Sequence, residues 1–348
     1  MSGVLRIDLD RFAANLSRVR EAVAPAELML VVKDDAYGHG LDATVRRARR
    51  EGVRWIGAFD VATGRRVRDV LGGDVRVFSW IAASRAEAAE AVAARLDLGV
   101  GDAELLEDVA AEARVAGALA RVHLKIDTGL HRNGVRPEEW PEFTARAAQL
   151  AAEGCLEVVG IWSHIAEASD EEDDAARALF DAAVTTARQA GLSPTMLHLS
   201  ASAASFARPE FRYNLVRVGA FCYGIRSAGG PDEEHLGVRP IATLEARVTA
   251  VDDDGASIDV GPLDGLPSIL AGRVTVGTPG GPRALTASGS GFRVEGWTNS
   301  APGDVVRIYG PGDGGESSAT DLAEAIGTIG EEIAVRVSPL VPRIYSGE

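Results

Sequence analysis

The chain has 348 residues, of which 46% are hydrophobic and 25% are charged, so it is long and apolar enough to bury at least one large core. Acidic residues outnumber basic ones, 51 against 36, and no basic tract interrupts this balance, which argues against nucleic-acid binding through phosphate neutralisation. The start lacks a basic and apolar leader, and no window has the roughly 18 uncharged apolar residues of a membrane span. We therefore expect a cytoplasmic protein with neither nucleic acid nor membrane as partner.

Short apolar, β-branched segments alternate with longer Ala/Arg/Glu-rich segments of helical period up to about residue 225. The expected strands are Leu28–Lys33, Trp55–Phe59, Val75–Trp80, Leu96–Val100, Arg121–Ile126, Glu157–Trp162, Thr195–Leu199 and Val216–Tyr223. The expected helices are Asp10–Val23, Asp42–Arg50, Ala62–Leu71, Arg85–Arg95, Ala103–Ala116, Pro137–Ala152, Glu171–Ala190 and Ala203–Arg208. Eight such units predict an α/β fold with an N-terminal (β/α)8 TIM-type barrel, and a doubly wound open sheet is the alternative.

After Gly224 the sequence becomes rich in Gly, Pro and Asp and then in short alternating strands. The expected elements are strands at Ala242–Val251, Ala256–Val260, Arg273–Val276, Phe292–Val294, Val305–Tyr309 and Val341–Tyr345, and a helix at Ala319–Ile326. The glycines of 277–282 are interpreted as turns. We expect a barrel over residues 1–233 and a smaller, mostly β domain over 234–348, which the first few residues could join.

Only two of the 36 basic residues are lysine, Lys33 and Lys125. A position that keeps lysine in such a chain can require a primary amine that loses its proton near neutral pH and forms a Schiff base, which arginine cannot do. The unusual polar residues follow the ends of expected strands, where barrel enzymes carry their reactive groups. They are Lys33, Lys125, Asp127, His164, Ser202 and Arg217. We expect no metal, since the sequence offers no cluster of His, Asp and Glu ligands.

Five motifs in this order resemble those of the pyridoxal-phosphate-dependent alanine racemase family. They are Val31-Val-Lys33-Asp-Asp-Ala-Tyr37-Gly-His-Gly40, His123-Leu-Lys125-Ile-Asp127-Thr-Gly-Leu-His131-Arg132-Asn-Gly-Val135, Gly160-Ile-Trp-Ser-His164-Ile-Ala166, His198-Leu-Ser-Ala-Ser202 and Asn214-Leu-Val-Arg217-Val-Gly219-Ala220. The resemblance is strong over residues 1–225 and looser beyond. It implies pyridoxal 5′-phosphate as cofactor, a small amino acid as substrate, and a homodimer in which the β domain of one chain caps the barrel mouth of the other.

The resemblance also implies roles for individual residues. Lys33 would bond covalently to the cofactor, and Tyr37, Ser202 and the amides of Gly219 and Ala220 would contact its phosphate.

Four further residues complete the implied site. Arg217 would face the pyridine nitrogen, and because arginine stays protonated it would keep that nitrogen unprotonated. Arg132 would hold the substrate carboxylate or the phenolic oxygen of the cofactor, Lys125, which is carboxylated in many family members, would orient Arg132, and His164 would bond Arg217.

The sequence departs from the family where a second proton donor is expected. Family members read Gly-Tyr-Ala-Asp-Gly-Tyr-Pro, and that first Tyr, supplied by the partner subunit, protonates Cα on the face opposite the lysine. The matching segment is Gly261-Pro-Leu-Asp-Gly-Leu-Pro267, so Pro262 replaces the Tyr. Candidate replacement bases are Asp34, Asp35, Asp264, Tyr309 and Tyr345, and spacing supports none of them.

Three hypotheses follow from these residues. The first is an isomerase of the alanine racemase type that acts at Cα with Lys33, Arg132, His164 and Arg217 in its active site. The second is a lyase (a retro-aldolase or a decarboxylase) or a transaminase that uses Lys33 as its one base. The third is a pyridoxal-phosphate-binding protein without catalysis.

Overall fold

The computed structural model describes residues 3–167, 169–199, 202–289 and 291–347. The chain forms two compact units. One comprises Met1–Arg18, Asp34–Glu51 and Ala220–Glu348, and the other comprises Val19–Lys33 and Gly52–Gly219. The domain boundary that the sequence places after residue 233 stays a prediction.

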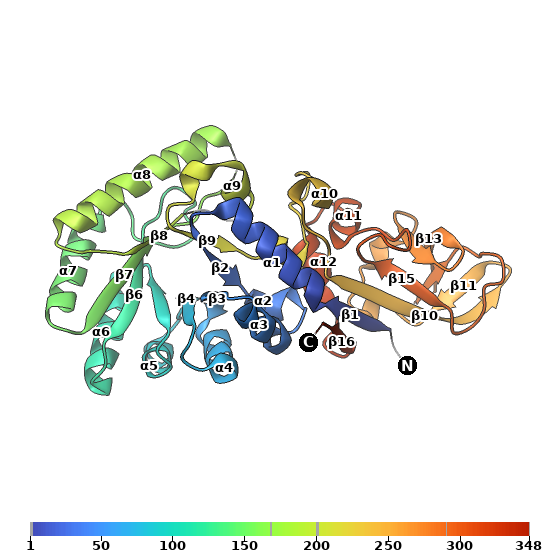
Figure 1. The fold of residues 1–348 in the computed structure, drawn as a ribbon, viewed down its shortest axis with the longest axis horizontal. Helices are drawn as coiled ribbons and strands as arrows, with labels where there is room; N and C mark the ends of the chain where they lie inside the picture. The colour runs from blue at the N-terminus through green and yellow to red at the C-terminus, as the bar shows by residue number, and fades with distance from the viewer. Residues whose placement is uncertain (1–2, 168, 200–201, 290, 348) are drawn as a thin grey trace. The chain divides into compact units, whose positions relative to one another are not determined.

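The unit containing Gly52–Gly219 has an eight-stranded parallel sheet in the order β8-β7-β6-β5-β4-β3-β2-β9 (Figure 1). Its strands are β2 (Glu27–Val31), β3 (Trp55–Asp60), β4 (Arg76–Ile81), β5 (Asp97–Val100), β6 (Ala120–Lys125), β7 (Leu156–Trp162), β8 (Met196–His198) and β9 (Leu215–Val218). Between the end strands, the side chain of Asn214 accepts from Leu197 N at 2.8 Å and donates to Thr195 O at 2.6 Å. The predicted α/β barrel is confirmed.

Helices follow most of these strands. They are α4 (Val61–Leu71), α5 (Arg85–Ala93), α6 (Ala103–Ala116), α7 (Trp140–Ala152), α8 (Asp170–Gln189) and α9 (Ser202–Ala207), with a 3-10 turn η1 (Pro209–Phe211). Asp60, Ser84, Asp102 and Ser169 each accept a hydrogen bond from the backbone N–H three residues on, so side chains placed directly before the helices start four of them. No helix among the described residues is both long and apolar enough to cross a membrane.

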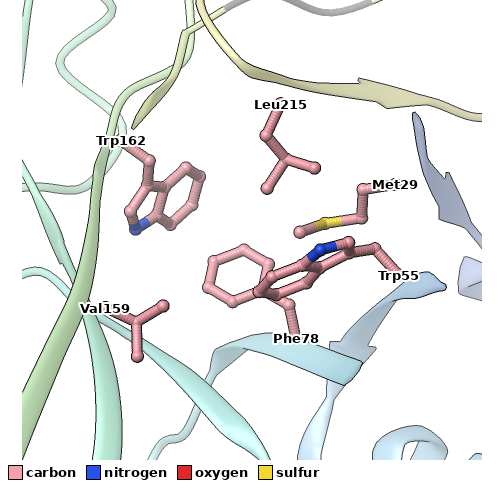
Figure 2. Close-up of a cluster of buried hydrophobic side chains, with 6 residues drawn as sticks. All are labelled: Met29, Trp55, Phe78, Val159, Trp162 and Leu215. Atoms are coloured by element: carbon pink, nitrogen blue, oxygen red, sulfur yellow. The ribbon is translucent and has the colours of Figure 1, made fainter. Parts of the chain in front are cut away.

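The inside of the barrel is aromatic. Figure 2 shows Met29, Trp55, Phe78, Val159, Trp162 and Leu215 gathered in one cluster, with Val159 and Trp162 both on β7. Glycines make room for these large side chains, since a Cβ on Gly99 would lie 3.0 Å from Trp162 and a Cβ on Gly57 would lie 3.2 Å from Met29. The core of the barrel is therefore apolar and closely packed.

The other unit is built on a second eight-stranded sheet, in the order β11-β14-β13-β12-β15-β10-β1-β16. Its strands are β1 (Val4–Asp8), β10 (Ala242–Asp252), β11 (Gly255–Ile258), β12 (Thr275–Thr278), β13 (Gly281–Ser288), β14 (Gly291–Val294), β15 (Val305–Tyr309) and β16 (Arg343–Ser346). The long strand β10 pairs with β11 as well as β15, which closes six antiparallel strands into a small barrel.

The β-barrel unit also carries short helices and turns. They are α3 (Leu41–Arg50), η2 (Ala220–Tyr223), α10 (Glu233–Leu236), η3 (Pro262–Asp264), η4 (Ser268–Leu270), α11 (Ala319–Glu324) and α12 (Gly330–Arg336). Two elements run from one unit into the other, α1 (Leu9–Val23) and α2 (Lys33–Tyr37).

Two sequence predictions are corrected here, and two elements were not predicted. The strand expected over Val216–Tyr223 ends at Val218, because after Gly219 the chain turns into η2. The turn expected over 277–282 is confined to Pro279 and Gly280, because residues 275–278 pair with 281–284 as β12 and β13. The sequence interpretation also missed β1 and α12.

Candidate active site

The chain after Lys33 makes a left-handed helical turn. Four consecutive non-glycine residues, Asp34 to Tyr37, have φ between 53° and 56°. Backbone hydrogen bonds from Gly38 N to Asp34 O (2.8 Å) and from Gly40 N to Asp35 O (2.9 Å) close it. Each such residue costs about 1–2 kcal/mol relative to a right-handed turn. The turn therefore stores strain directly beside the lysine, as functional sites often do.

Aromatic packing compensates for this strain. The ring of Tyr37 lies 5.0 Å from that of Tyr223, and the rings of His39 and Phe12 lie 5.1 and 5.5 Å from Tyr223. Nδ1 of His39 lies 2.9 Å from Ala36 O. Tyr37 is buried, and burial raises the pKa of its hydroxyl well above the usual range. The hydroxyl is therefore a hydrogen-bonding group and not an anion.

The charges of four basic side chains act on His164, which follows β7. Burial and the charges of Arg217, Arg132, Lys125 and Lys33 together lower the pKa of the His164 imidazole to about 3. His164 is therefore neutral at pH 7, and its Nδ1 lies 3.3 Å from Nη2 of Arg217. A concentration of basic side chains in a chain of net charge −15 favours a ligand with anionic groups.

Lys125, the last residue of β6, has an unusual environment. It is buried, and its Nζ lies 4.5 Å from the ring centroid of Trp162. Burial, with the charges of Arg132 and Arg217, lowers the pKa of Lys125 to about 8, although Asp127 opposes the shift. Asp127 itself is bound by the amides of Gly129 and His131 and by the His131 ring. The carboxylate thus holds its loop, and Lys125 is partly neutral near physiological pH.

Arg217 lies inside β9 with both terminal nitrogens bonded to the barrel. Nη1 donates to Nδ1 of His198 (2.8 Å) and to His198 O (3.0 Å), and Nη2 donates to Ser163 O (2.7 Å) and Leu199 O (3.1 Å). Burial, reinforced by Arg132, lowers the pKa of Arg217 to about 9, so it stays protonated at pH 7. Among the hydrogen bonds of the described residues, none uses Nε–H of Arg217, which leaves this donor to a ligand.

The other residues named from the sequence are divided between the two units. Ser202 and Gly219 belong to the same unit as Lys33, and the Ser202 hydroxyl accepts from Gly219 N at 3.4 Å. Tyr37 and Ala220 belong to the β-barrel unit. Lys33 begins α2, two residues after β2 ends at Val31, so it follows the strand instead of ending it.

The five candidate replacement bases all lie in the β-barrel unit. Asp34 and Asp35 are exposed within the left-handed turn, and Asp264 accepts from Gly261 N at 2.9 Å in η3. Tyr345 donates to His39 O at 3.1 Å. Tyr309 is buried, and burial raises its pKa. Among the described residues, no three His, Cys, Asp or Glu side chains are arranged to hold a metal ion.

The sequence interpretation missed two residues that shape this site. His198 is the acceptor for Arg217, and Trp162 lies against Lys125 and also 5.1 Å from the Arg217 guanidinium. Both stand inside the quoted motifs, at the ends of β8 and β7. The one available signal was their closeness in sequence to candidates, since His198 stands four residues before Ser202 and Trp162 two before His164.

The fold and these contacts define a protein with a parallel α/β barrel and a β-barrel domain, whose α/β barrel gathers cations at the carboxyl ends of its strands. The family model "Alanine racemase, N-terminal domain" matches residues 7–227. The chain is 35% identical to the alanine racemase of Thermobifida fusca, over 98% of this chain and 97% of that protein. It is 38% identical to the alanine racemase of Salinispora tropica, over 99% of this chain and 98% of that protein.

Solved structures agree with these sequence matches. The structure of alanine racemase from the D-cycloserine producer Streptomyces lavendulae matches with a TM-score of 0.93 and 32% identity, over 100% of this chain and 98% of that one. Alanine racemase from Streptomyces coelicolor matches with a TM-score of 0.93 and 33% identity, over the same shares. The chain belongs to the alanine racemase family, a family of pyridoxal-phosphate-dependent isomerases.

Proposed function

We propose that this protein is a pyridoxal-phosphate enzyme that moves a proton at Cα of a small amino acid, as alanine racemases do. The observation that carries the proposal is that Lys125 and Arg217 both lie against the Trp162 ring, with Arg217 beside His164, in an acidic chain. A phosphorylated, phenolic aldehyde and an amino-acid carboxylate are ligands whose negative charges match these cations.

The donors present suit this cofactor. Lys33 would bond to its aldehyde, Nε–H of Arg217 would donate to the ring nitrogen, and Ser202 and Gly219, which already contact each other, would bind phosphate oxygens. Tyr37 and the amide of Ala220 would complete the phosphate site. When bound, pyridoxal phosphate supplies an electron sink for the charge that develops at Cα.

The protein's own groups would then handle the substrate. Lys33, released as an amine when substrate replaces it, would take or give the proton at Cα from one face. Arg132 would hold the substrate carboxylate, oriented by Lys125. Arg217, protonated at pH 7, would keep the ring nitrogen unprotonated and so limit the lifetime of charge at Cα, which favours simple proton exchange over side reactions.

Pro262 favours a second candidate, chemistry from one face only. Proline has no ionisable proton, and the residue stands where the resemblance places a Tyr. We therefore keep a one-base lyase or a transaminase as the alternative, with Lys33 as its base. A non-catalytic cofactor-binding protein is the third hypothesis.

We also propose that the protein is a homodimer. Leu263 and Leu340 are 96% and 88% exposed, and Ser338 N donates to Asp264 O at 2.9 Å, which brings their two segments together. Exposed leucines of this kind are expected at an interface between copies. A dimer would let the segment around Pro262 of one chain cap the barrel mouth of the other.

Proton NMR in deuterium oxide distinguishes these functions. The cofactor-loaded protein is incubated separately with L- and D-alanine, serine and threonine, and loss of the Cα proton, handedness and new products are followed. Exchange with inversion from both alanine enantiomers supports racemisation, and exchange or cleavage from one enantiomer supports one-faced chemistry. Pro262→Tyr should then increase inversion, with Leu263→Tyr as the matched control. No exchange and no product from a loaded protein contradicts both.

A further inference from the structure

A line of buried polar side chains crosses the aromatic core of the barrel. Nδ1 of His198 lies 2.8 Å from Nη1 of Arg217, and Nε2 of His198 lies 2.8 Å from Nδ1 of His123. Nε2 of His123 lies 3.5 Å from Oδ1 of Asp97, an electrostatic contact and not a hydrogen bond, and among the described residues this nitrogen has no hydrogen-bond partner. The side chains of Asp97, His123 and His198 are fully buried. Together they connect the first residue of β5 to the arginine in β9.

Arg217 determines the direction of both hydrogen bonds in this line, and Asp97 faces its other end. Arg217 can only donate, so Nδ1 of His198 must accept and its proton must lie on Nε2. That proton is donated to Nδ1 of His123, which places the His123 proton on Nε2, facing the carboxylate. The reverse arrangement would set two donors against each other at Arg217 and a lone pair against the carboxylate at Asp97.

Both imidazoles are neutral, and Asp97 is ionised. Burial lowers the pKa of His123 and of His198. Burial raises the pKa of Asp97, but its interactions with His123 and Arg76 outweigh it and hold the pKa at about 2. Arg76 binds both carboxylate oxygens, with Nε 3.0 Å from Oδ2, and Nε of Arg121 lies 3.3 Å from Oδ2. The two arginines therefore fix the carboxylate at the start of the line.

Aromatic rings pack around the two imidazoles and hold them in place. The Phe78 ring lies 4.8 Å from His123 and 5.3 Å from His198, and the Trp162 ring stacks on His198 at 5.8 Å. In an environment of low dielectric, hydrogen bonds in a chain polarise one another. A charge at Asp97 is therefore felt at Arg217 through two rings.

We infer that Asp97, His123 and His198 are positioning residues that set the hydrogen-bonding state of Arg217 from the opposite part of the barrel core. This line of side chains keeps Nδ1 of His198 as a hydrogen-bond acceptor, so Nη1 of Arg217 stays hydrogen-bonded to it. The Nε–H of Arg217 then remains the donor available to a ligand. The inference deepens the proposed function, since it rests on the role proposed for Arg217 at the ring nitrogen.

The direction of the hydrogen bonds in this line is measured directly from the tautomers of the two imidazoles. Histidine is labelled with ¹⁵N in the full-length protein without cofactor, and long-range ¹H–¹⁵N spectra and the N–N coupling across the hydrogen bond are recorded. We expect a proton on Nε2 of both rings and a coupling between Nε2 of His198 and Nδ1 of His123. A proton on Nδ1 of His198, a charged ring or no coupling would overturn the inference.

Asp97→Asn tests whether the carboxylate stabilises the arrangement of the two rings. Its side chain has one acceptor oxygen, which Arg76 and Arg121 both require, so its NH2 is left to face Nε2 of His123. Arg217 still holds the proton of His198 on Nε2, so the Nε2–H of His123 then faces an NH2 group, donor against donor. We expect the His123 ring to move and its coupling to His198 to weaken or vanish, and an unchanged coupling would overturn the role of Asp97. If the variant does not fold, the wild-type coupling decides.

Glu157→Gln is the matched control. Glu157 is exposed on β7 and its charge acts on Arg76, so the variant removes a nearby negative charge without touching the line. Its coupling between His198 and His123 should match the wild type, and the same loss of coupling in it would reduce the role of Asp97 to general electrostatics and overturn the inference.

A second readout separates this inference from the proposed function. In the loaded enzyme, Asp97→Asn should lower kcat on the order of tenfold with KM unchanged, because it perturbs Arg217 through its outer partners and leaves Arg132 intact. An unchanged kcat would contradict the effect on Arg217. If the loaded wild type is inactive while the tautomers are as stated, the proposed function fails and the line stands.

Discussion

Gly160 leaves the space that His123 occupies. A Cβ built on Gly160 would lie 2.4 Å from Nδ1 of His123 and 2.7 Å from Met196 O, so no larger residue fits beside the imidazole without movement. Gly160 stands on β7, which neighbours β6, the strand of His123. The glycine in the third quoted motif thus has a packing reason inside the barrel, besides its closeness in sequence to His164.

Gly160→Ala should destabilise the protein by about 1–3 kcal/mol, the usual cost of overpacking a core. The side chain of His123 must shift, and its hydrogen bond with His198 should lengthen or break. The unfolding free energy from urea titration measures the cost. Gly73→Ala is the control, because a Cβ there meets nothing within 4 Å. Equal stability of the two variants would mean that the core adjusts without strain.

Asp34→Gly should stabilise the protein by about 1 kcal/mol, because glycine adopts the left-handed conformation without the penalty of a Cβ. Asp34 is exposed, so its removal costs little packing. Asp42→Gly, in the first turn of the right-handed helix α3, should lower stability by about 0.5–1 kcal/mol. Thermal melts of both variants give the comparison, and a loss of stability in Asp34→Gly would refute the strain.

Lys125 should react with small electrophiles at unusually low pH. With a pKa of about 8, roughly one-tenth of its amine is neutral at pH 7, roughly a few hundred times the fraction of an ordinary lysine. Since the pKa is lowered, reactivity should rise with pH and level off above 8. Carbamate formation from ¹³C-bicarbonate, followed by NMR, measures it.

Arg132→Ala provides a check on the cause of that shift. Removing this cation should raise the pKa of Lys125 and move the reaction to higher pH, whereas Arg136→Ala, an exposed neighbour in sequence, should not. A titration midpoint near 10 in the wild type would show that burial does not act on this amine.

Leu263→Glu combined with Leu340→Glu should weaken the proposed dimer at least about tenfold, because charge replaces apolar contact at an interface. Analytical ultracentrifugation over a range of concentrations measures the dissociation constant. Val115→Glu is the control, since Val115 is 78% exposed on α6 of the α/β barrel. A monomeric wild type, or a double variant that dimerises as tightly, would remove these leucines from the interface.

Sequence patterns were sufficient for the parallel barrel because its strands are buried on both faces and are separated by long amphipathic helices. The β domain was harder. The Gly-Gly-Pro sequence at 280–282 predicts a turn. Because Gly281 and Pro282 pair with β12, however, strand β13 already begins at Gly281. Strand β1 was overlooked because it pairs with β10 and β16, which are more than 200 residues away in sequence.

The candidate site could also be predicted only in part from the sequence. Lys33, Lys125 and Arg217 stood out because each follows or lies within a strand and is chemically unusual there. The left-handed turn of Asp34 to Tyr37 could not be foreseen, since none of these residues is glycine and tertiary packing on Tyr223 imposes the conformation. Asp97 stood unnoticed because its partners, Arg76 and His123, come from neighbouring strands.

The central claim, that this protein holds pyridoxal phosphate on Lys33, is tested most directly by borohydride reduction of the loaded protein followed by peptide mass mapping. The chain has only two lysines, so the result is unambiguous. We predict that the reduced cofactor is found on the peptide containing Lys33, and that Lys33→Ala retains none. Cofactor on Lys125, or no reducible cofactor in the wild type, would contradict the account.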